Sequence, residues 1–229
     1  MKPIIGIIEW PYKDEDGDLI YEVPNNIVEK ISIHGGIPVG IFPTQIEDFQ
    51  NKRLSEIDEL TFIEKQDLRE SLDRVDAIIK PGALKIYGFE RYIYDYAFNK
   101  DIPYLGICAG MQLMAGFQND KYNNVKNETD IHHSKEEYAH KLRILKNTLL
   151  YDILKTEEIE VNSRHRYHIA NAGIHDINAY SEDGIIEGIE NRDKLFHLGV
   201  QWHPENLNDE NTNKIFDEFI ESAKKVKRK

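Results

Sequence analysis

Residues 103–112 read PYLGICAGMQ, and this stretch decides the fold. An apolar run leads into Cys108, which stands between Gly106 and Gly110, and a segment of helical pattern follows at once. A sharp strand-to-helix turn of this kind holds its central side chain in a strained backbone conformation. The two glycines supply the space that a close crossing of strand and helix requires. We therefore expect a buried strand, a strained turn and a helix over residues 110–117.

The place of Cys108 in this turn favours a nucleophile. The pattern resembles the nucleophile elbow of serine hydrolases, and it presents the sulfur at the carboxyl end of the sheet, where open α/β folds bind ligands. A helix N-terminus favours the thiolate over the thiol, and the N–H of Ala109 can donate to a developing oxyanion. The competing interpretation is a buried, small apolar side chain, the usual role of a lone cysteine. The flanking glycines favour the nucleophile.

A second stretch, residues 199–205, reads GVQWHPE and ends another apolar strand. Side chains two residues apart in an extended chain point to the same side, so His203 and Glu205 are expected to share a face. Glu205 can then accept a hydrogen bond from one imidazole nitrogen and leave the other facing the thiol, as in a catalytic triad. The competing interpretation is an acid–histidine pair on the surface. We predict that Cys108, His203 and Glu205 are the catalytic residues.

The first half of the chain alternates apolar strands with helical patterns, which predicts a parallel sheet with helices on both faces. A helix with Ile27, Val28 and Ile31 on one face is expected to be capped by Asn25 or Asn26 and to stop at residues 35–36. Residues 13–18 look like a loop, and residues 44–61 have no assignable pattern. Strands are expected at residues 3–8, 37–42, 76–79 and 103–107, and helices at 63–72, 89–98 and 110–117.

The second half differs because its apolar segments follow one another more quickly. Strands are expected at residues 141–145 and 159–162, around Ala170, and at residues 185–189 and 198–202, with some of them in antiparallel hairpins. A final amphipathic helix covers about 211–223. The prediction is an α/β three-layer sandwich with a mainly parallel sheet and a small antiparallel addition. Residues 1–229 are expected to form a single domain.

Composition excludes several classes of protein. The formal net charge of −12 disfavours a nucleic-acid partner, which usually meets a basic patch. The sequence contains no apolar run of about 18 residues and no signal-peptide pattern, so we expect no membrane association and a cytoplasmic protein. The single cysteine excludes an intrachain disulfide and a cysteine-rich zinc site. No cofactor is expected.

Together, the Gly-x-Cys-x-Gly elbow and the His-Pro-Glu segment resemble the pattern of class I glutamine amidotransferases. Within them the chain is most similar to the γ-glutamyl hydrolase branch, peptidase family C26, which includes γ-glutamyl-γ-aminobutyrate hydrolase. Further similar elements are Gly-Gly-Ile-Pro-Val at 35–39, Lys-Pro-Gly-Ala at 80–83, Val-Asn-Ser-Arg-His at 161–165 and Asp-Gly-Ile-Ile-Glu at 183–187. The resemblance implies a flavodoxin-like fold. It also implies hydrolysis of a γ-glutamyl amide through a thioester on the cysteine.

The resemblance also implies roles for individual residues. Backbone N–H groups of Gly82 and Ala83 would complete the oxyanion hole with Ala109, and the element at 183–187 would line the substrate side. Substrate contacts are predicted from four residues: Gln112, Asn162, Ser163 and His165.

The chain departs from the family at several positions that bear on the substrate. Ala83 stands where the family has a second glycine, and Lys85 where it has an aspartate. The stretch 116–122 and the pair Arg166-Tyr167 also differ. These changes leave the identity of the leaving amine open.

Several histidines invite a metal site: His132, His133, His140, His165 and His168. The sequence places no acidic partner beside them, and the local pattern around residues 165–168 is extended or looped rather than helical. We therefore predict no metal.

Three functions remain open from the sequence. The first is a free-standing hydrolase of small γ-glutamyl amides, the second a glutaminase subunit that supplies ammonia to a separate synthetase in trans, and the third a catalytically silent regulatory protein on the same scaffold. The intact Cys, His and Glu argue against the third. Whether the chain forms a homodimer is left open.

Overall fold

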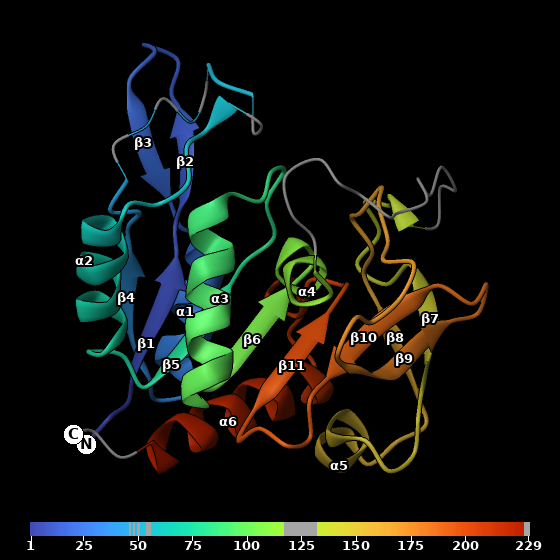
Figure 1. The fold of residues 1–229 in the computed structure, drawn as a ribbon. Coiled ribbons are helices and arrows are strands. Elements are labelled where there is room, and N and C mark those ends of the chain that lie inside the picture. Colours follow the sequence, from blue (N-terminus) through green and yellow to red (C-terminus); the bar gives the residue numbers. More distant parts are fainter. Residues whose placement is uncertain (46, 48, 50, 54–55, 117–131, 227–229) are drawn as a thin grey trace.

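The computed structural model describes residues 1–45, 47, 49, 51–53, 56–116 and 132–226. Within them, nine strands form one sheet in the order β4-β1-β5-β6-β11-β10-β9-β7-β8 (Figure 1). The first five strands of this order are parallel: β4 (Ile37–Ile41), β1 (Ile4–Ile8), β5 (Ala77–Lys80), β6 (Tyr104–Ile107) and β11 (His197–Val200). The predicted parallel core is therefore confirmed. Most of the departing stretch at 116–122 lies outside the described residues.

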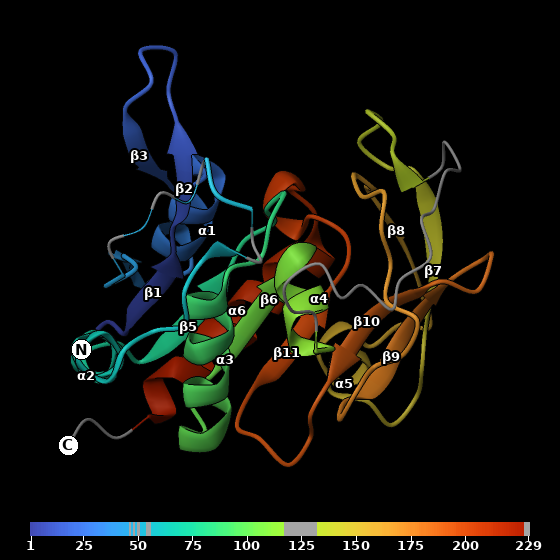
Figure 2. The same cartoon turned by 45° about the horizontal axis from the view of Figure 1, so that its top comes forward.

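Helices cover both faces of the sheet because the parallel strands are apolar on both sides. In β1, for example, Ile5 and Ile7 pack into one core cluster while Ile8 packs into the other. Figures 1 and 2 show α3 and α6 on opposite sides of the sheet. One core contains side chains of α2 (Phe62–Leu72), α3 (Gly88–Lys100) and α4 (Ala109–Met114); the other contains those of α1 (Asn25–Ile33), α5 (Leu149–Leu154) and α6 (Glu210–Lys225). This is the predicted three-layer sandwich.

The rest of the sheet is antiparallel. It is built from β10 (Ile186–Glu190), β9 (Asp176–Ser181), β7 (His140–Ile144) and β8 (Glu158–Val161). A separate hairpin of β2 (Trp10–Lys13) and β3 (Leu19–Glu22) projects beyond the carboxyl end of β1 (Figure 1). The expected loop at 13–18 is mainly the turn of this hairpin. No helix of the described chain combines the length and the apolar character needed to cross a membrane.

Several local expectations were wrong or incomplete. Helix α1 begins at Asn25 with Pro24 as its cap residue and no side-chain cap, because both asparagines lie inside the first turn. No strand forms at Ala170. The sequence pattern also missed the short strands β2, β3 and β9 and the six-residue helix α5.

Candidate functional site

The site is built on the predicted elbow, where β6 runs into α4. Cys108 has φ 52° and ψ −103°, a combination rarely adopted by residues with a side chain. A Cβ on Gly106 would lie 2.7 Å from the backbone carbonyl carbon of Gly110, and a Cβ on Gly110 would collide with the carbonyl oxygen of Lys80. Both glycines are therefore needed for close packing, as the sequence predicted.

Main-chain hydrogen bonds hold the strained residue on both sides. The N–H of Cys108 donates to Val200 O at 2.8 Å, and its carbonyl accepts from Gln112 N at 3.1 Å. Strain of this kind costs about 1–3 kcal/mol and persists only where the surroundings fix it. The elbow is thus locked between β11 and the first turn of α4.

His203 and Glu205 meet as predicted, but not for the predicted reason. Glu205 lies in a 3₁₀ turn, η3 (Pro204–Asn206), rather than in an extended strand. The turn brings a Glu205 carboxylate oxygen to 2.7 Å from His203 Nδ1. The carboxylate is buried, with 6% of Glu205 exposed, so it can orient the ring without competition from water.

The ring of His203 also reaches Cys108, so the three predicted residues are contiguous. Burial disfavours the charged ring, but the Glu205 carboxylate and the hydrogen-bonded Cys108 sulfur together hold the pKa of His203 well above its usual value. The ring beside the sulfur therefore favours its protonated form.

Asn162 fixes the main chain of this histidine. Its Nδ2 donates to His203 O at 2.7 Å, and its Oδ1 accepts from His203 N at 2.8 Å. The predicted contact between Asn162 and substrate stays a prediction, but both ends of its amide are occupied by the protein. The pairing joins the end of β8 to the end of β11.

A pocket of about 470 Å³ opens beside the sulfur, within the usual range for small-molecule sites. Its lining includes Cys108, Ala109 and Ala83, together with Arg164 and Arg166, which we call the pocket arginines. Among the described residues, those that line this pocket include no aspartate or glutamate. The pocket therefore suits an anionic ligand end.

The residues predicted for the oxyanion hole lie close to Cys108. A Cβ built on Gly82 would lie 3.5 Å from Cys108 Cβ, Ala83 lines the pocket and Ala109 follows the nucleophile. Ala83 is not among the residues with positive φ, so its backbone conformation does not demand the glycine usual in the family. Their role in binding an oxyanion stays a prediction.

Of the other predicted substrate contacts, two residues line the pocket and one does not. Gln112 and His165 line the pocket, although the Gln112 amide also donates to Tyr167 O at 3.0 Å and to Gln201 Oε1 at 3.2 Å. The Ser163 hydroxyl is buried and donates to His132 O at 3.1 Å. These internal bonds could not be predicted from sequence pattern, because they join segments far apart in the chain.

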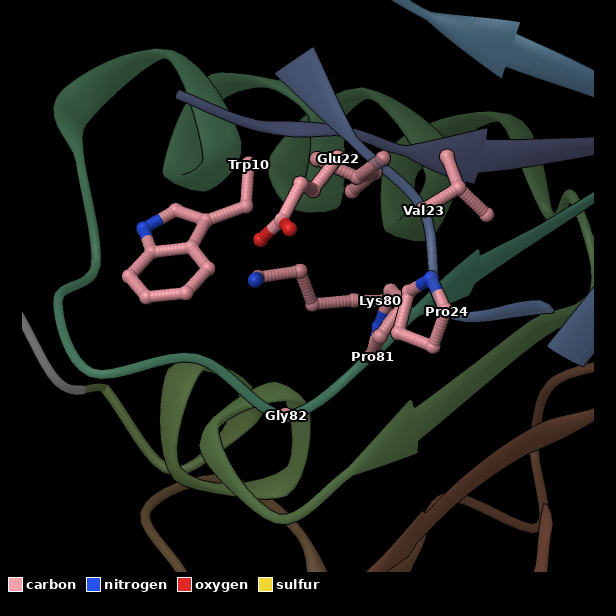
Figure 3. A pocket seen from close by; sticks show the side chains of 8 residues that line it. Trp10, Glu22, Val23, Pro24, Lys80, Pro81 and Gly82 are labelled. Carbon is pink, nitrogen blue, oxygen red and sulfur yellow. The ribbon is translucent and has the colours of Figure 1, made fainter. Parts of the chain in front are cut away.

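A second pocket, of about 320 Å³, lies on the other side of the Pro81–Gly82 loop. Figure 3 shows the Lys80 side chain extending toward Trp10 and Glu22 across this pocket. Lys80 is only 1% exposed, and its Nζ lies 2.9 Å from Glu90 Oε1. This buried ion pair anchors the strand end that carries the loop beside the sulfur.

The amino-acid sequence is similar to a known protein family and to several known proteins. The Peptidase C26 family model matches residues 3–205. Protein NtpR of Enterococcus hirae is 29% identical over 241 residues, which cover 96% of this chain and 99% of that protein. A CTP synthase from Hydrogenobaculum is 29% identical over 199 residues, covering 72% of this chain and 37% of the enzyme.

Solved structures show the same fold. The glutaminase domain of Trypanosoma brucei CTPS with bound acivicin superimposes with a TM-score of 0.70 at 18% identity, covering 98% of this chain and 95% of that one.

A sequence relative from Schizosaccharomyces pombe that carries a glutamine amidotransferase name is 40% identical over 139 residues. That match spans 54% of the yeast protein, so this chain spans about half of its length.

Proposed function

Because the chain belongs to the peptidase C26 family, we propose that it hydrolyses a γ-glutamyl amide bond, in glutamine or in a glutamate joined through its γ-carboxyl to a small amine or amino acid. The observation that carries this proposal is the set of contacts at the elbow. A strained cysteine contacts a histidine whose other nitrogen lies 2.7 Å from a buried carboxylate. One water would be consumed, and glutamate and the amine would be released.

In the proposed reaction the Cys108 thiolate attacks the γ-carbonyl carbon. The carbonyl electrons move onto oxygen, which accepts hydrogen bonds from the N–H groups of Ala109 and the Gly82–Ala83 loop. As the C–N bond breaks, His203 gives its proton to the leaving amine and a glutamyl thioester remains. His203 then takes a proton from water, which attacks the thioester and releases glutamate and the thiolate. Glu205 keeps the ring oriented throughout.

The pocket arginines suit the glutamyl end of the substrate. A guanidinium group binds a carboxylate through two parallel hydrogen bonds, and an amino-acid substrate joined by its γ-carbonyl presents a free α-carboxylate. Both arginines line the same pocket as the sulfur. We assign the α-carboxylate of the glutamyl group to them.

The experiment is a screen of glutamine and γ-glutamyl amines with released glutamate measured. Cys108→Ala should lose activity by about 10⁴-fold or more, as loss of a triad nucleophile does. An alkylating glutamine analogue should label the wild-type chain once, at its single cysteine, and glutamine should protect against labelling. Glutamate release by the alanine variant at the wild-type rate would refute the proposal.

A second candidate is a glutaminase subunit that delivers ammonia to a synthetase in trans. It is favoured by the match to a CTP synthase, of which 37% aligns with this chain. This candidate predicts that the purified chain hydrolyses glutamine slowly and that a co-purifying synthetase raises kcat. Rapid hydrolysis of a γ-glutamyl amine by the chain alone would favour the first candidate.

A further inference from the structure

Four titratable side chains outside the proposed triad converge at one point. These are His132, His140, His165 and Glu187, which we call the histidine–glutamate cluster; one ligand atom from each lies within 4.8 Å of all the others. Glu187 is the second residue of β10 and His140 the first residue of β7, while His165 follows β8. Glu187 and His132 are both 0% exposed. The acidic partner that the sequence did not locate is therefore supplied by a neighbouring strand.

The spacing of the four atoms fits a small ion. Glu187 Oε1 lies 3.3 Å from His132 Nδ1, 3.3 Å from His165 Nε2 and 3.8 Å from His140 Nε2, and the first two nitrogens are 3.3 Å apart. Zinc binds imidazole nitrogen and carboxylate oxygen at about 2.0–2.1 Å, so the edges of its tetrahedron measure about 3.3–3.4 Å. Three of the four spacings already match such an edge.

The outward nitrogens of the three rings fix which nitrogen faces inward without a proton. His132 Nε2 lies 3.1 Å from a carboxylate oxygen of Asp183, and His165 Nδ1 lies 3.1 Å from Tyr167 O. His140 Nδ1 lies 3.4 Å from Lys141 O. Carboxylate and carbonyl oxygens only accept hydrogen bonds, so each outward nitrogen carries the proton in a neutral ring. The same outer partners orient histidine ligands in metal sites.

The consequence is that four acceptors face one another. In the neutral rings each inward nitrogen presents a lone pair, and neither oxygen of Glu187 receives a well-aligned hydrogen bond from the described residues. The nearby Ser163 hydroxyl, 3.4 Å from His132 Nδ1, donates instead to the His132 carbonyl. When the three rings are protonated only on their outer nitrogens, this buried carboxylate has no donor, which is costly, whereas a cation at the centre would satisfy all four atoms.

We propose that the histidine–glutamate cluster binds one zinc ion. Four protein ligands fill a tetrahedron, so the site would be closed and structural rather than catalytic. Zinc would tie β7 and β10 to the segment after β8. Asp183, itself held by Ser181 Oγ at 2.5 Å, would act as the outer partner of His132.

The first test is the metal alone on the full chain. Protein stripped with a chelator and then dialysed against ZnCl₂ should retain one equivalent by elemental analysis. Replacement with Co²⁺ should give the intense visible absorption of a tetrahedral site. No retained zinc, or the weak spectrum of octahedral cobalt, would overturn the proposal.

Variants then locate the ion. His140→Gln and Glu187→Gln should each raise the zinc Kd by more than about 10-fold, and Asp183→Asn by about 10- to 100-fold as an outer-partner change. The matched control is His175→Gln, an equally buried histidine that contacts Tyr94 and Met114 instead. If the ligand variants fold poorly, the partly exposed Asp183 still decides the matter. Zinc affinity unchanged in Asp183→Asn, or lost equally in the control, would place the ion elsewhere.

Discussion

Gly82→Ala should disable the site through a single methyl group. A Cβ at this position would lie 2.7 Å from His203 Cε1, about 0.7 Å inside the 3.4 Å at which ordinary contact begins. The ring cannot simply swing away, because Glu205 holds its Nδ1 at 2.7 Å and Asn162 holds its main chain. Either the imidazole or the loop must shift by a sizeable fraction of an ångström.

The size of the effect follows from that shift. A misplacement of about 1 Å costs on the order of 100-fold in rate, so kcat should fall about 10- to 100-fold while KM changes little. Overpacking should also lower the free energy of unfolding by about 1–3 kcal/mol. The N–H of residue 82 remains in alanine, so a lost oxyanion donor is not the cause.

The assay is glutamate release from the best substrate of the screen, with circular dichroism and thermal unfolding to confirm folding. Gly88→Ala is the matched control, because no atom lies within 4 Å of its added Cβ and its φ is not positive. It should keep wild-type kcat. A folded Gly82→Ala variant with kcat within a factor of two of wild type would refute the expected clash between residue 82 and the His203 ring.

Four further outcomes are expected. Glu90→Gln should lower the free energy of unfolding by about 3–5 kcal/mol, because it leaves the Lys80 ammonium buried without its partner. The measurement is a denaturant titration, and a decrease of less than about 1 kcal/mol would contradict the prediction. The pKa of His203 is raised, so its contribution to the free energy of unfolding is complete below about pH 6.5 and is lost as pH rises through the folded-state pKa. Glu205→Gln should reduce this loss of stability at alkaline pH, measured by unfolding at a series of pH values. An unchanged pH dependence would count against the pairing of His203 with Glu205. Asn162→Ala removes both bonds to the His203 main chain and should reduce kcat and thermal stability together; a change in KM alone would instead support the predicted substrate contact. Replacing either pocket arginine by glutamine should raise KM about 10- to 100-fold with little change in kcat, and an effect confined to kcat would exclude the assigned carboxylate contact.

The parallel core could be predicted because burial on both faces leaves a strong trace in sequence. Continuous apolar runs such as residues 4–8 and 77–79 have few alternatives to a central strand. The elbow could be predicted equally well, because close backbone contacts require glycine at positions 106 and 110. Strand β9 was missed because Asp176–Ser181 mixes polar and apolar residues and gains its place from pairing with β10 and β7.

Contacts between distant segments could not be predicted from pattern. His203 and Glu205 were paired correctly, yet a 3₁₀ turn rather than strand alternation brings them together. The histidine–glutamate cluster needed the sheet order as well, because Glu187 reaches His140 only when β9 and β7 follow β10 in the sheet. Residue spacing alone carries no information about that order.

The segment at residues 162–167 connects the two sites. Asn162 clamps the main chain of His203, and three residues later His165 enters the histidine–glutamate cluster. The pocket arginines alternate with His165 along the same stretch and line the cavity beside the sulfur. A segment held at one end by the amide of Asn162 and in its middle by a bound ion would have little freedom to move. The proposed zinc would therefore act on the proposed amide hydrolysis by fixing the pocket wall, while the proposed thiol chemistry would rest on the elbow and the His203–Glu205 pair.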